Sequence, residues 1–111
     1  TVAKGYTLEV TEDMAQTIKG SSTIKISGDL VIDVTGSITF KAGGTLEMSS
    51  GTDMTVKAGA GLKSSSGASY AVKAGADLKL EGLSIAGKAS ASAEVDGGGM
   101  LTLKGGMVKL N

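Results

Sequence analysis

An eight-residue unit repeats ten times over residues 2–81 without insertion or deletion. Positions 5 and 7 of each unit, and position 1 of the next, are mostly apolar, whereas positions 2 to 4 are mostly polar or small. Because side chains two positions apart point to the same side of an extended chain, each unit predicts one apolar triplet followed by a turn. A fixed period of this kind constrains the fold more than any local propensity. The units begin at Val2, Val10, Ile18, Ile26, Val34, Ala42, Ser50, Ala58, Ser66 and Ala74.

A single unit is too short to form one coil of a β-solenoid, because enclosing a core needs at least three faces. Either one chain winds three successive units around itself, or three chains wind together and each supplies one unit per face. The only aromatic residues are Tyr6, Phe40 and Tyr70, which disfavours a core filled by one chain alone. Three chains winding together also hide the strand edges. The predicted fold is therefore all-β, an intertwined triple-stranded β-helix that forms a homotrimeric fibrous prism with octad repeats.

The predicted core of the trimer consists of the large apolar residues at positions 1, 5 and 7. They are Ile18, Ile24, Ile26, Leu30, Ile32, Val34, Ile38, Phe40, Leu46, Met48, Met54, Val56, Leu62, Tyr70, Val72, Leu78 and Leu80. Gln16, Ser22 and Ser64 interrupt the apolar triplets. They are either mild defects or places where water or an ion sits on the axis, and the sequence leaves both readings open.

Turn-forming residues recur at the corners between the triplets. Position 4 is Gly, Asp, Ser or Thr in every unit, and glycine moves from position 3 to position 2 at Gly43 and Gly44. At the same point position 1 changes from Val or Ile to Ala or Ser. We therefore expect the shaft to narrow, or its corner geometry to change, near residues 42–50. We also expect the corner glycines to permit positive φ and close backbone approach.

Position 8 forms a polar exterior. Lysine occupies it in alternate units, at Lys25, Lys41, Lys57 and Lys73. This pattern is typical of a solvated face that keeps a β-rich rod from aggregating.

The repeat divides the chain into a shaft, residues 1–81, and a narrowing C-terminal apex, residues 82–111. After residue 81 the octad is lost, and a period of two continues with side chains mostly reduced to alanine. Gly97–Gly99 predicts a flexible or tightly packed break, and Gly105–Gly106 a sharp turn. The last segment predicts a blunt, partly apolar face that binds a partner. Its tip residues are Met107, Val108, Leu110 and Asn111.

The octads and the ending at residues 105–111 resemble the C-terminal needle of contractile-injection spikes. These are the VgrG proteins of type VI secretion, the central spike of T4-like phages and related particles. The needle repeat consists of an aliphatic residue, any residue, Gly and five further residues. Residues 18–20, 26–28 and 34–36 match its first three positions, and residues 42–44 match them loosely. From residue 50 onward the glycine sits one place earlier. The resemblance implies a homotrimer below a larger hub, with a free end capped by a separate PAAR-repeat protein.

The composition argues against catalysis and against several binding classes. The chain has no His and no Cys, which removes the commonest nucleophile and proton-transfer partners, so no catalytic residue, metal ligand or cofactor is predicted. Eleven Lys and eleven acidic residues cancel, which gives no basic surface for nucleic acid. No apolar run approaches the length of a membrane span, and no signal-peptide pattern opens the chain.

The sequence thus predicts a structural part rather than an enzyme: the membrane-piercing needle tip of a contractile injection machine. We expect it to be assembled in the bacterial cytoplasm and to end up secreted or particle-associated. Its expected partners are two further copies of itself, a PAAR-type cap at the tip and the target membrane. The alternative is a monomeric β-solenoid, such as an adhesin or an ice-binding rod, although no regular array of outward Thr-x-Thr pairs favours ice binding.

Overall fold

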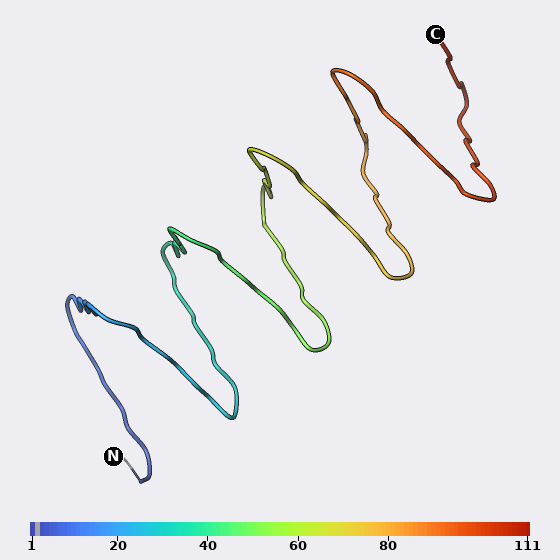
Figure 1. Cartoon of the computed structure of the whole chain (residues 1–111). Helices are drawn as coiled ribbons and strands as arrows, with labels where there is room; N and C mark the ends of the chain where they lie inside the picture. Colours follow the sequence, from blue (N-terminus) through green and yellow to red (C-terminus); the bar gives the residue numbers. More distant parts are fainter. Residues whose placement is uncertain (2) are drawn as a thin grey trace. The chain divides into compact units, whose positions relative to one another are not determined.

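The chain runs extended between bends, and its computed structural model describes Thr1 and residues 3–111. Val2, which opens the first octad, lies outside these residues. Over the described residues there is no helix and no strand. Figure 1 shows extended segments joined by sharp changes of direction.

The bends recur every eight residues, as the repeat predicts. Each falls on positions 2 and 3 of an octad, where polar and small residues replace the apolar ones. The six residues between two bends are extended and carry the apolar triplet. The expected corners are therefore present. They lie at residues 3–4, 11–12, 19–20, 27–28, 35–36, 43–44, 51–52, 59–60, 67–68 and 75–76.

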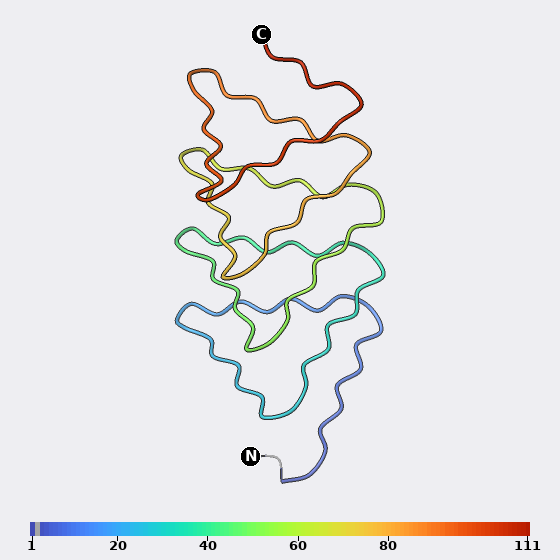
Figure 2. The same cartoon turned by 90° about the vertical axis from the view of Figure 1, so that its right-hand side faces the viewer.

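The chain divides into two units, Thr1–Met54 and Thr55–Asn111. In Figure 2 the first unit runs from blue to green and the second from green to red, and each consists of the same extended segments and bends. Within each unit, no described residues twelve or more positions apart have Cα atoms within 8 Å of each other. Each unit is thus an open trace in which only neighbours along the sequence come close.

The expected intertwined triple-stranded β-helix is wrong for this structure. A strand in a sheet needs a neighbour about 4.7–4.9 Å away to receive its backbone hydrogen bonds. In the described residues of each unit no distant segment comes that close, so the extended segments have no ladder and are not strands. The single-chain coil considered as the alternative needs the same ladder between its own turns. The period was read correctly from the sequence, but the pairing was not.

The bends occupy the same octad positions before and after the point at which glycine moves from position 3 to position 2. Bends occupy residues 35–36, 43–44 and 51–52, always positions 2 and 3. Among the described residues only Gly98 has positive φ, at 62°. The expected positive φ at the shaft corners is therefore wrong, and the bend positions do not change near residues 42–50.

Bends also continue beyond residue 81, where the sequence octad ends. They lie at Leu83, at residues 90–91 and at Gly106, and a closed turn occupies residues 98–99. The sharp turn expected at Gly105–Gly106 is a bend at Gly106. The changes of direction therefore continue beyond residue 81, where the apolar octad pattern has ended.

Candidate functional site

The structure leaves the predicted core residues exposed to solvent. All described residues are exposed, and none of the large apolar side chains among them is buried. Ile32 is 59% exposed and Phe40 71% exposed, although both belong to the predicted axis. Residues from different octads are not brought together within either unit, because segments distant in sequence do not approach each other. The predicted core residues therefore lie on the surface and form no core.

Exposure nevertheless follows the octad. Among the large apolar residues, Val10, Ile18, Ile26 and Val34 at position 1 are the least exposed, at 44–47%, and each directly precedes a bend. Val31, which lies between two triplet residues and points the other way along an extended chain, is 82% exposed. The large apolar side chains at positions 5 and 7 are more open to solvent than those at position 1, at 51–79%.

Exposed apolar side chains recur in this way along both units. A soluble monomer rarely shows extended apolar surface, and such surface usually marks an interaction site. The described lysines of position 8, Lys25, Lys41, Lys57 and Lys73, are exposed as expected. Gln16, Ser22 and Ser64 are also exposed, and their axial role stays a prediction.

The predicted tip residues form a short extended segment after the bend at Gly106. Met107 is 85% exposed, Leu110 is 87% exposed and Val108 is 54% exposed, and Asn111 is exposed with them. Three apolar side chains within four residues therefore lie open to a partner.

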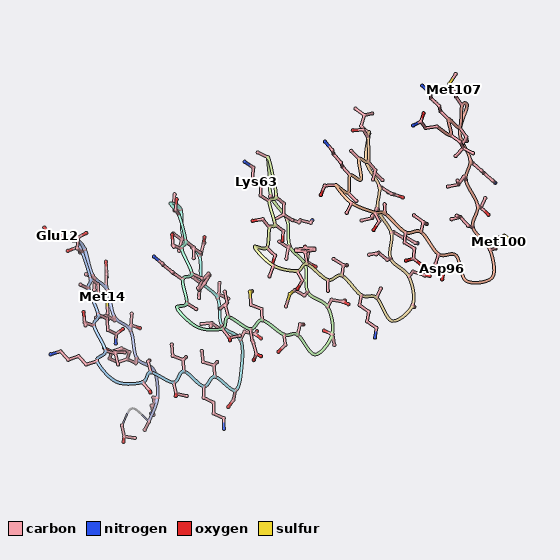
Figure 3. All side chains as sticks on the ribbon, turned by 45° about the horizontal axis from the view of Figure 1, so that its top comes forward. Glu12, Met14, Lys63, Asp96, Met100 and Met107 are labelled. Atoms are coloured by element: carbon pink, nitrogen blue, oxygen red, sulfur yellow. The ribbon has the colours of Figure 1, made fainter. Side chains whose placement is uncertain are left out.

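A closed turn at Asp96–Met100 was not anticipated as a structural element. The backbone N–H of Met100 donates to the carbonyl oxygen of Gly97 at 3.2 Å. The backbone N–H of Gly98 donates to the Oδ1 atom of Asp96 at 2.8 Å. In Figure 3 Asp96 and Met100 lie on the two arms of this turn. The Asp-Gly sequence was the available signal, since Asp caps turns and Gly accepts positive φ.

The described part of the chain offers no enclosed site for a small ligand. No pocket is present there. Those residues also contain no group of three His, Cys, Asp or Glu side chains placed to hold a metal ion. None of their segments is a helix with the length and apolar character to cross a membrane.

No protein-family model, curated protein or solved structure matches the chain significantly.

Proposed function

We propose that this chain is the shaft and apex of a membrane-piercing spike of a contractile injection machine, either of the type VI or of the phage-tail-like class. In this proposal three copies act together. The observation that carries the proposal is the apolar surface, which recurs at each octad and which no other part of the described chain covers. The resemblance of the octads to injection needles supplies the class of machine.

Ordering the chain costs free energy, and association can offset this cost where the isolated chain cannot. Fixing the backbone of one residue costs about 1–2 kcal/mol, and burial of apolar surface is the main term that offsets this cost. None of the described residues is buried. In this proposal other copies supply the burial.

A copy of the same chain is the partner that fits this surface. The surface repeats every eight residues over ten octads, so its partner must repeat with the same period over the same length. An identical chain meets both conditions. Three copies are the number that the resemblance to injection needles implies.

The corner glycines support close approach by another chain. A Cβ atom built on Gly28 or Gly51 would meet nothing within 4 Å, and neither residue has positive φ. The single chain therefore has no steric need for glycine at these corners. A copy packed against the corner provides one, because it needs room for its own backbone.

Stiffness is the proposed mechanism. Contacts repeated along the whole shaft make bending or compression disturb many octads at once, so force from a contracting sheath reaches the tip without unfolding it. The lysines of position 8 keep the outer surface solvated. No catalytic group is needed for this task.

The segment 107–111 is the proposed binding site for a PAAR-type cap. Its exposed Met107 and Leu110 side chains provide apolar contact area, and association with a cap would remove them from water. The chain contains no His, which favours a separate cap over a metal-binding tip built from histidines.

Binding of a PAAR-repeat protein to the chain tests this assignment by isothermal titration calorimetry. The double variant Met107→Ser/Leu110→Ser should lose binding. The matched control Leu83→Ser/Met100→Ser, which removes one Leu and one Met of comparable exposure elsewhere, should keep it. Native mass spectrometry of both variants shows whether the copies still associate. Equal binding by the two double variants would refute the tip assignment.

A further inference from the structure

The Asp96–Met100 turn is the one place in the described residues where a backbone–backbone hydrogen bond closes the chain on itself. The shaft corners have weaker support. Ser50 Oγ donates to the carbonyl oxygen of Asp53 at 2.7 Å, and the N–H of Ala68 donates to Ser66 Oγ at 3.4 Å. The C-terminal turn therefore differs in kind from the open bends of the shaft.

Three features of the sequence fit the conformation of this turn. Gly98 has φ of 62°, a value that other residues rarely adopt. A Cβ atom on Gly97 would collide with the carbonyl oxygen of Met100, so the position needs glycine. The Asp96 carboxylate accepts the N–H of Gly98 and fixes the entry to the turn. Positive φ at the first central residue alone is the pattern of a type II′ turn, which reverses a chain with the twist of a hairpin.

We propose that the Asp96–Met100 turn forms within a single chain before association and nucleates the assembly of the copies from their C-terminal segments. This inference rests on the proposed association. All contacts of the turn lie within five residues, so the turn forms without a partner and closes a very short loop. It places Val95 and Leu101, both exposed, on its two arms.

The contacts that a single chain can make determine whether the turn or the shaft octads become ordered first. The shaft octads have no distant contacts within either unit, so they become ordered only when another copy arrives. The turn is already closed at that time, and its arms present apolar side chains in a fixed geometry. The first productive encounter between copies then occurs at this end, where the least ordering remains.

The test compares association rates of turn variants and of control variants outside the turn. The full 111-residue chain is unfolded in denaturant and diluted at several concentrations, and association is followed by light scattering. Gly98→Ala and Asp96→Ala remove the positive-φ residue and the cap. Gly87→Ala and Ser66→Ala are the controls. Gly87 lies outside the octad corners and a Cβ there would meet nothing within 4 Å, and Ser66 accepts a backbone N–H two residues on, as Asp96 does.

The turn variants should associate on the order of tenfold more slowly than the controls. The rate at which the assembled form unfolds should change little, as expected for a nucleus. Gly98→Asn should restore part of the rate, because Asn is accepted at the positive-φ position of primed turns better than Ala. A Gly98→Ala chain that fails to associate while Gly98→Asn succeeds also supports the inference.

Two results would overturn the inference. Turn variants that associate as fast as Gly87→Ala and Ser66→Ala show that the turn is not the nucleus, while the proposed association stands. A wild-type chain that stays at its single-chain mass of 10.9 kDa overturns both the nucleation and the association.

Discussion

Replacing Ile32 with Thr should weaken association, whereas the same replacement at the adjacent Val31 should not. Ile32 belongs to an apolar triplet and is 59% exposed in the single chain, and Val31 faces the other way and is 82% exposed. Ile32→Thr keeps the branched shape at Cβ but removes two carbon groups, worth about 1.6 kcal/mol when fully buried. Val31→Thr exchanges one methyl group for a hydroxyl group on the side left in water.

The exposed fraction of Ile32 sets the expected size of the effect. About three-fifths of the residue is still open to burial, so the substitution removes about 1 kcal/mol per copy and about 3 kcal/mol for three copies. A loss of about 3 kcal/mol lowers the association constant by about 100-fold. Val31→Thr should change the same free energy by no more than about 0.5 kcal/mol.

Urea-induced dissociation, followed by native mass spectrometry at fixed chain concentration, measures both variants against the wild-type chain. The two substitutions are adjacent in sequence and similar in β-propensity, so a shared effect on the unassociated chain cancels between them. Equal losses for Ile32→Thr and Val31→Thr would show that association does not select the triplet side, and the reasoning from the octad would fail.

Two further changes examine the other parts of the octad. Phe40→Ser should lower the melting temperature of the associated form by several degrees while Lys41→Ser leaves it nearly unchanged, because only Phe40 belongs to a triplet; equal melting temperatures in a thermal denaturation scan would contradict this. Gly28→Ala should leave the unassociated chain unaffected, since its Cβ meets nothing within 4 Å, but should cost the associated form about 1–3 kcal/mol through overpacking at the corner. A melting temperature that is unchanged or raised by Gly28→Ala, measured beside a Ser27→Ala control, would argue against close approach of another chain there.

The sequence alone predicts the corners of this chain. They are a local property, because small and polar residues at positions 2 and 3 bend the backbone wherever they recur. The exposure of Val31 relative to Ile32 also follows from the alternation of side chains along an extended chain.

The same reasoning could not predict which extended segments pair with one another. A triplet such as Leu30, Ile32 and Val34 indicates which side of the chain avoids water, but not which segment will cover it. The predicted β-helix supplied a cover and a backbone ladder, and the described residues of each unit contain neither. Apolar periodicity fixes the side to be buried, whereas a fold also needs a partner at hydrogen-bonding distance.

The C-terminal turn was predicted only in part. Gly97–Gly99 predicts a flexible or tightly packed break, which leaves the conformation open. The preceding Asp96 changes this outcome, since its carboxylate holds the N–H of Gly98 and the turn closes between Gly97 and Met100. The tip residues Met107, Val108, Leu110 and Asn111 stay a prediction until a cap is tested.

The mass of the chain in solution tests the central claim most directly. Sedimentation equilibrium at physiological ionic strength should give three times the 10.9 kDa chain mass, about 33 kDa, because the proposal has two further copies cover the exposed apolar triplets. A species of 10.9 kDa that persists at high chain concentration would contradict the account.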